Sequence, residues 1–333
     1  MKRELLVLII AVMCLSLCSC GKSEAATNAD NMILEIGEIT LQSGDKITDA
    51  EEAVGNLKES EYKQLEQISI LEEARTTYDR LVEEKRIADN NKAISEIKSA
   101  IDAIGAVTLE QESAIISART LYNKGNNDVK AGITNYEVLE QAEAELSNLK
   151  VQTVINLIDQ IGQVSLDSGE KIDAAKAAYK TLTSTEKGQV TNSANIEAAS
   201  AKLSELQTEN RVKSIIKVTE LQVSSPNSAG GVSLYVGFKN MSDKVIKYIT
   251  FEVVPYNAVG DIVYCDIRDY ANFRGRDTGP YAKGEGLAGD NSGYWDCAWY
   301  NYSITDVELK SIDIEYMDGT RESLSGNELN YVF

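Results

Sequence analysis

Histidine is absent from the 333 residues of this sequence. Its absence excludes Ser-His-Asp and Cys-His catalysis and zinc bound through imidazole. Acid–base catalysis by carboxylates stays open, because it needs no imidazole. Basic residues are also scarce: 33 Lys and Arg stand against 52 Asp and Glu, for a formal net charge of −19. Nucleic acid and an anionic membrane surface both require a basic face, so this balance argues against either as a partner.

Long hydrophobic runs are confined to the N-terminus. The apolar stretch over 5–17 follows a basic start and is short for a membrane span. The segment Leu-Cys-Ser-Cys-Gly resembles the lipobox of bacterial lipoproteins, with Leu17 at −3 and Ser19 at −1 relative to Cys20. The resemblance implies cleavage before Cys20 and a lipid on its sulfur. An ordinary secretory signal is the alternative. We expect 1–20 to be signal peptide and lipobox, followed by a linker over 21–30.

One phrase occurs three times in the first two thirds of the sequence. Its copies carry an Ile-Gly pair at Gly37, Gly105 and Gly162, which are 68 and 57 residues apart. Such self-similarity predicts a repeat architecture. Glycine suits a left-handed helix end, and the apolar residues that follow have helical spacing. We therefore expect three helices per repeat. The predicted repeats are 31–91, 92–148 and 149–210.

The junctions between repeats contain no helix breaker. Neither Pro nor Gly occurs from Tyr136 to Ile161 or over 69–104, so the last helix of one repeat should continue as the first of the next. Thr108 and Gln111 have the spacing of a capping box for the second helix of the middle repeat. Bundles that share helices predict an elongated, coiled-coil-like all-α region.

The repeated phrases IDAIG-V-T-L and TNY--L--AE--L resemble three-helix repeats of Gram-positive surface proteins, over about 31–210. The resemblance implies a stalk that lifts another domain from the membrane. An adhesin whose helices bind a host protein is the alternative. Residues 21–210 carry 19 Lys and Arg and 34 Asp and Glu, a surplus typical of a solvated surface.

Helical spacing gives way near Arg211 to alternating β-branched and aromatic residues. This pattern predicts an all-β domain over 211–333, most simply a sandwich. The segments 231–238 and 244–254 flank a turn-forming KNMSD and should form a hairpin. The other expected strands are 214–223, 261–267, 293–300, 307–317 and 329–333.

The stretch from LYVGFKNMSD to NAVGD resembles FxLYD-like, immunoglobulin-like domains of secreted Gram-positive proteins. The whole of 211–333 is similar to an uncharacterised domain at the end of such lipoproteins. The resemblance implies fold and location and assigns no activity. Strand alternation places Cys265 and Cys297 on the same faces as apolar neighbours, so both should point inward. A disulfide between them, which an extracytoplasmic compartment permits, would resemble the immunoglobulin core. Two buried free thiols are the alternative.

A glycine-rich segment, 274–295, is expected to be a long loop. Its aromatic faces and directed Arg donors suit a shallow glycan or peptide site, although a merely structural loop is the alternative. Candidate ligand-binding residues are Arg274, Arg276, Asp277, Tyr281, Tyr294 and Trp295. Its glycines lack phosphate-loop spacing, and Asp290, Asn291 and Ser292 lack EF-hand spacing. No catalytic residue, metal or cofactor is predicted.

These observations together predict a non-enzymatic protein on the extracytoplasmic face of the cell membrane, held there by its lipid. Its helical stalk would display a binding or attachment domain for a cell-wall polymer or a surface protein. A cell-wall-active hydrolase is a further alternative. A solute-binding lipoprotein is disfavoured, because no alternating βαβ pattern appears. The oligomeric state is left open.

Overall fold

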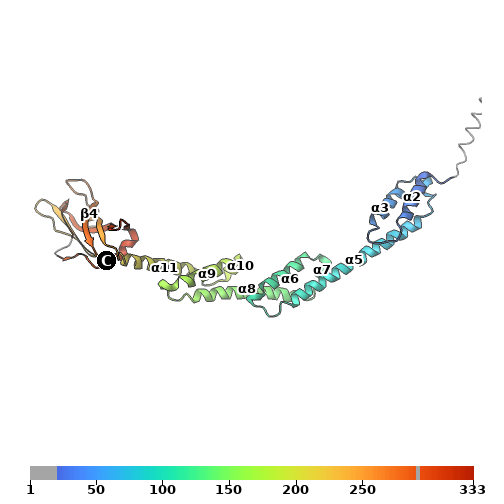
Figure 1. Cartoon of the computed structure of the whole chain (residues 1–333), viewed down its shortest axis with the longest axis horizontal. Helices are drawn as coiled ribbons and strands as arrows, with labels where there is room; N and C mark the ends of the chain where they lie inside the picture. Colours follow the sequence, from blue (N-terminus) through green and yellow to red (C-terminus); the bar gives the residue numbers. More distant parts are fainter. Residues whose placement is uncertain (1–20, 290–292) are drawn as a thin grey trace, which may run out of the picture. The chain divides into compact units, whose positions relative to one another are not determined.

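The computed structural model describes residues 21–289 and 293–333 (Figure 1). Residues 24–213 are mainly helical and are followed by a β region of two antiparallel sheets. The expected change from an all-α to an all-β region is therefore confirmed. The chain divides into two compact units between Leu149 and Lys150, within helix α8 (Tyr136–Asp159).

The longest helices of the described chain are α5 (Ile68–Asp102) and α8, which two repeats share, and the next longest is α11 (Ala194–Lys213). Before α8 come α2 (Glu24–Glu35), α3 (Gly44–Gly55), α4 (Glu59–Tyr62), α5, α6 (Glu112–Lys124) and α7 (Asn127–Ala131). After it come α9 (Gly169–Thr181), α10 (Ser184–Gln189) and α11. The expected uninterrupted helices are thus confirmed as α5 and α8. The boundary expected at residue 211 falls inside α11.

Three clusters of buried residues lie in the helical part of the described chain. The first draws on α2, α3 and α5, the second on α5, α6 and α8, and the third on α8, α9 and α11. Equivalent buried positions follow the spacing of the glycines: Ile33, Ile101 and Ile158; Ile47, Ile115 and Ile172; Ala50, Ala118 and Ala175; Leu71, Leu139 and Ile196; Ala74, Ala142 and Ala199. The sequence repeats because each bundle buries the same small aliphatic set.

The glycine at the end of the first helix takes the predicted left-handed conformation in all three repeats. Its φ is +68° at Gly37, +62° at Gly105 and +59° at Gly162. The predicted capping box at Thr108 is wrong. Its side chain makes no capping hydrogen bond, and a 3-10 turn over Leu109–Gln111 precedes α6. The equivalent turn of the third repeat does have a capping box, between Ser165 and Ser168.

An ion pair at one position changes polarity between the first two repeats. In the first repeat Arg75 on α5 binds Glu51 on α3 at 2.5 Å, whereas in the second Arg119 on α6 binds Glu143 on α8 at 2.5 Å. The second helix is acidic there in one repeat and basic in the other. Exchange of helices between repeats would bring like charges together, so the pair favours packing within each repeat.

The β region consists of two four-stranded sheets that share one core. One contains β1 (Ile216–Val223), β2 (Gly231–Asn240), β5 (Gly286–Leu287) and β6 (Gly293–Tyr300). The other runs β4 (Phe273–Tyr281), β3 (Ile246–Asn257), β7 (Ile304–Tyr316) and β8 (Arg321–Ser325). Phe238 of the first sheet packs on Phe251 of the second, with ring centres 5.6 Å apart. Val212 of α11 also belongs to this core.

Several expected elements differ. The predicted β2–β3 hairpin is wrong, because the two strands belong to different sheets. Residues 261–267 form no strand and make a single bridge, between Ile262 and Tyr256. The end of the chain is a 3-10 helix, Gly326–Tyr331. The expected loop over 274–295 contains most of β4. The alternation of apolar and polar residues along a strand indicates which side chains are buried. It does not specify which other strand pairs with it.

Candidate functional site

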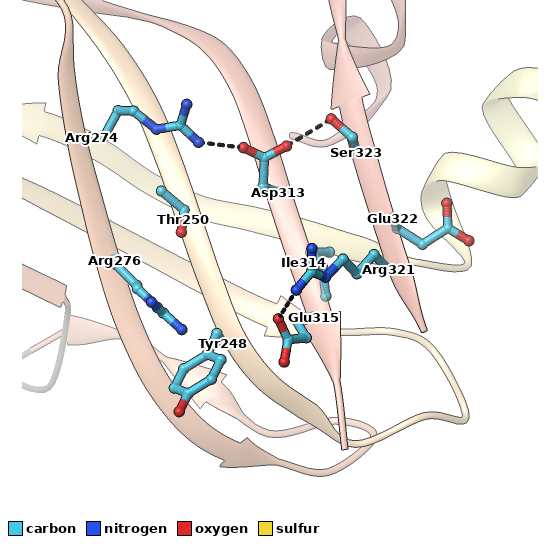
Figure 2. A pocket seen from close by; sticks show the side chains of 10 residues that line it. All are labelled: Tyr248, Thr250, Arg274, Arg276, Asp313, Ile314, Glu315, Arg321, Glu322 and Ser323. Carbon is cyan, nitrogen blue, oxygen red and sulfur yellow. Dashed lines mark hydrogen bonds and ion pairs between the residues drawn. The ribbon is translucent and has the colours of Figure 1, made fainter. Parts of the chain in front are cut away.

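The outer face of the sheet that contains β3 carries a shallow hollow of about 460 Å³ (Figure 2). Four strands contribute to it. Its lining residues are Tyr248, Thr250, Arg274, Arg276, Asp313, Ile314, Glu315, Arg321, Glu322 and Ser323. Alternation along β4 explains the outward Arg residues: Arg274 and Arg276 are exposed, while Gly275 between them is buried.

Strand register places the polar side chains opposite one another in rows across the sheet. Thr250 of β3 faces Arg276 of β4 on one side and Asp313 of β7 on the other, and Asp313 faces Ser323 of β8. In the neighbouring row Tyr248 faces Glu315, which faces Arg321. Residues far apart in sequence thus meet on a rigid surface.

A bulge in β3 widens the polar surface. The register with β7 shifts between Ile246 and Tyr248, so Lys247 is an extra residue on β3 relative to that strand. In the β3–β4 pair the extra residue at this point lies on β4. Its Nζ lies 5.0 Å from the Tyr248 ring centre and 3.3 Å from a Glu315 carboxylate oxygen. A hydrogen bond from Lys247, aided by one from Arg321, holds the pKa of Glu315 below its usual value against the opposing effect of desolvation.

The carboxylates around the hollow are paired with cations. Asp313 binds Arg274 at 2.6 Å and also accepts a hydrogen bond from Ser323 at 2.7 Å. Arg274 lies 3.6 Å from Glu252 as well. Glu322 points away from the other lining side chains (Figure 2) and lies 3.6 Å from Arg211 of α11.

Arg276 differs from the other cations of the hollow. Its guanidinium carbon lies 3.7 Å from the centre of the Tyr248 ring, so it stacks on that ring. Within 21–289 and 293–333 no carboxylate forms an ion pair with it. The arrangement therefore presents one positioned cation without a carboxylate partner beside hydroxyl and carboxylate groups. Such a surface suits polar recognition.

The structure brings only Arg274 and Arg276 of the predicted ligand residues into the hollow. Asp277 and Tyr281 lie on the inward side of β4, where the Tyr281 hydroxyl donates to Asp277 at 3.0 Å. Burial and this carboxylate raise the pKa of Tyr281 to about 12. The Tyr281 ring also packs edge-on against Phe238.

The remaining two predicted residues belong to β6 in the other sheet. Tyr294 donates to Asp296 at 3.0 Å. Trp295 packs into the core, and a Cβ added at Gly275 would lie 2.7 Å from its ring. Sequence reasoning missed the contributions of β3, β7 and β8, namely Tyr248, Thr250, Asp313, Glu315, Arg321 and Ser323. Their polar positions alternate with buried ones, which could have marked an outer face but not its neighbours.

Both cysteines of the β region are free thiols, so the candidate disulfide is not formed in the structure. Cys265 is buried, and its sulfur accepts a hydrogen bond from the Tyr300 amide at 3.4 Å. Cys297 is only half-buried and has φ +49°. The β2–β6 register shifts beside it, which interrupts the alternation used to predict its inward orientation.

Cys20, the predicted lipidation site, lies outside the described residues. So do Asp290, Asn291 and Ser292, for which the sequence predicts no metal site. Within the described ranges, no group of three or more acidic or cysteine side chains is placed to hold a metal ion. In the same ranges, no helix has the length and apolar character to cross a membrane. No protein family and no curated protein matches the chain. The function must therefore be inferred from the hollow itself.

Proposed function

We propose that this chain is a lipid-anchored protein of the extracytoplasmic membrane face whose β region binds or attaches to a cell-wall polymer without catalysis. The helical repeats serve as its stalk. The observation that carries the proposal is the hollow on the outer face of the β4-β3-β7-β8 sheet. Its volume of about 460 Å³ falls within the range of ligand sites.

The chemistry of the hollow favours recognition over turnover. Guanidinium, hydroxyl, carboxylate and phenol groups face outward from hydrogen-bonded strands, and such groups match the hydroxyls and charges of a polymer. The Asp313 and Glu315 carboxylates are each engaged by cations. The lowered pKa of Glu315 favours its charged form, which makes this carboxylate a poor general acid.

The lipobox-like segment ending at Cys20 supports the anchor, and continuous α5 and α8 support the stalk. Two antiparallel sheets around one core, with Trp299 fully buried, support an immunoglobulin-like sandwich. These features suit a module held away from the bilayer, where it can reach a polymer.

Co-sedimentation with purified cell-wall sacculi tests the binding. The chain over 21–333 should pellet with sacculi. Thr250→Trp, which fills the centre of the hollow, should weaken pelleting by about tenfold or more, as loss of a few polar contacts would. Thr305→Trp is the matched control, because Thr305 is an exposed β7 residue outside the hollow. If both variants pelleted equally, the hollow would not be the binding site. If the parent chain did not pellet, the proposal of wall attachment would be wrong.

Detergent partition of the full-length chain tests the anchor. The parent protein, produced in a lipid-modifying host, should enter the detergent phase, and Cys20→Ala should abolish this. Cys18→Ala is the control, because it removes a neighbouring thiol and leaves the lipobox cysteine. Unchanged partition of Cys20→Ala would contradict lipidation at this residue.

A further inference from the structure

We propose that the hollow contains a subsite for a single oxyanion, centred on Arg276, and that the bound polymer supplies a phosphodiester or a carboxylate there. This inference rests on the proposed function, since it names the chemistry that the same hollow recognises.

Each carboxylate of the hollow is matched by a cation other than Arg276. Asp313 has Arg274, and Glu315 has Lys247 and Arg321. Two more carboxylates share cations: Glu252 lies near Arg274, which also binds Asp313, and Glu322 lies near Arg211, which also binds Glu328. Arg276 remains as the cation of the hollow that no carboxylate of the described residues binds, in a protein whose overall charge is strongly negative.

The position of Arg276 suits an anion better than a flexible surface cation would. Stacking on the Tyr248 ring at 3.7 Å orients the guanidinium plane and reduces the entropy lost on binding. The ring occupies one face of the guanidinium and leaves its in-plane N–H donors for an oxyanion, which they can bind in bidentate fashion. Thr250, directly opposite on β3, adds a hydroxyl beside this position.

The rest of the hollow limits how much negative charge the ligand can carry. The Asp313 carboxylate lies in the same cross-strand row as Thr250 and would repel a second anion there. Asp313 and Ser323 instead suit hydroxyl groups. The ligand that fits is therefore a polymer with isolated negative charges separated by neutral, hydroxyl-rich units.

Titration calorimetry on the chain over 21–333 tests the subsite with three soluble probes: poly(glycerol phosphate), polyglucuronate and a neutral glucan. At least one anionic probe should bind more tightly than the glucan, and its affinity should fall with added salt. The two anionic arms distinguish a phosphodiester from a carboxylate ligand. Arg276→Gln should lower the affinity for the preferred anionic probe by about tenfold or more. Arg276→Lys should lower it less, because lysine keeps the charge although it lacks the planar donors.

Arg268→Gln is the matched control, because it removes one positive charge from an exposed turn of the β region away from the hollow. It should bind like the parent chain. Equal affinities of Arg276→Gln and the parent for every anionic probe would overturn the subsite. So would failure of both anionic probes to exceed the glucan. Sacculi pelleting that is unaffected by Arg276→Gln would overturn the subsite and leave wall attachment standing, whereas Arg276-dependent probe binding without pelleting would support the subsite and overturn wall attachment.

Discussion

The helical region and the β region have hydrophobic cores of different composition and extent. The buried apolar side chains of the described helical residues are Ala, Val, Ile and Leu, in three separate clusters. All four Phe, both Trp and all three Pro of the chain lie within 211–333. There a single core joins both sheets, with Trp299, Phe238 and Phe251 among its largest buried side chains.

This difference determines how far a local defect should spread. Each helical cluster is assembled mainly from three helices that follow one another closely in the sequence, so damage should stay largely within one repeat. The β core joins strands from the whole of 216–325, and the hollow depends on the alignment of four of them. The proposed binding surface therefore lies in the region where core damage is least contained.

Paired core truncations should have the largest effect. Trp299→Ala removes a fully buried ring whose indole N–H donates to Ala271 at 2.7 Å, and should cost about 3–5 kcal/mol. Leu139→Ala in the second helical cluster should cost about 2–5 kcal/mol. Denaturant titrations followed by near- and far-ultraviolet circular dichroism measure both. Only Trp299→Ala should also impair pelleting with sacculi. Equal impairment by Leu139→Ala would contradict the view that damage to a helical cluster stays within its repeat.

Glycine substitutions should separate backbone strain from packing at intermediate cost. Gly162→Ala places a side chain at φ +59° and should cost about 1–2 kcal/mol, with no steric contact involved. Gly275→Ala should cost about 1–3 kcal/mol, because its Cβ would press on Trp295. Gly188→Ala in α10 is the control and should stabilise by about 0.4–1 kcal/mol. If Gly275→Ala left the free energy of unfolding unchanged, the core around Trp295 would adjust to the added Cβ more easily than expected.

The pH dependence of folding stability should also differ between the two regions, by a smaller amount. The Arg75 hydrogen bond lowers the pKa of Glu51. Its contribution is complete above the unfolded pKa, about 4.3, and is lost as pH falls through the lower folded value. The pKa of Tyr281 is about 12 in the folded chain, so its contribution is complete below about pH 10 and is lost as pH rises through 12.

Denaturant midpoints across both pH windows measure these effects. Compared with the parent chain, Glu51→Gln should reduce the pH dependence of the midpoint at acid pH. Tyr281→Phe should reduce it at alkaline pH. If Tyr281→Phe kept the parental slope above pH 10, burial of the phenol would not govern alkaline stability.

The smallest expected effect is that of a reductant. Because Cys265 and Cys297 are free thiols, dithiothreitol should leave the melting temperature of the chain over 21–333 unchanged. A thiol assay on the denatured, unreduced chain should count both. Loss of a structural disulfide would instead cost about 2–5 kcal/mol, so a marked drop in melting temperature would contradict the free thiols.

Much of the helical region could be predicted because its information is local. The spacing of Gly37, Gly105 and Gly162 corresponds to equivalent helix ends, and unbroken segments became α5 and α8. The candidate site was harder. Arg274 and Arg276 were identified from composition, but they were placed in a loop, and Trp295 was grouped with them although it packs in the core.

By itself the sequence determined where helices give way to strands and where the repeated helices end, because residues a few positions apart set those features. Only the tertiary structure decided that β2 and β3 belong to different sheets, that Cys297 lies at a bulge, and that Tyr248 supports Arg276. The physical reason is that strand pairing joins residues distant in the chain. Alternation reveals the buried face of a strand but not the strand beside it.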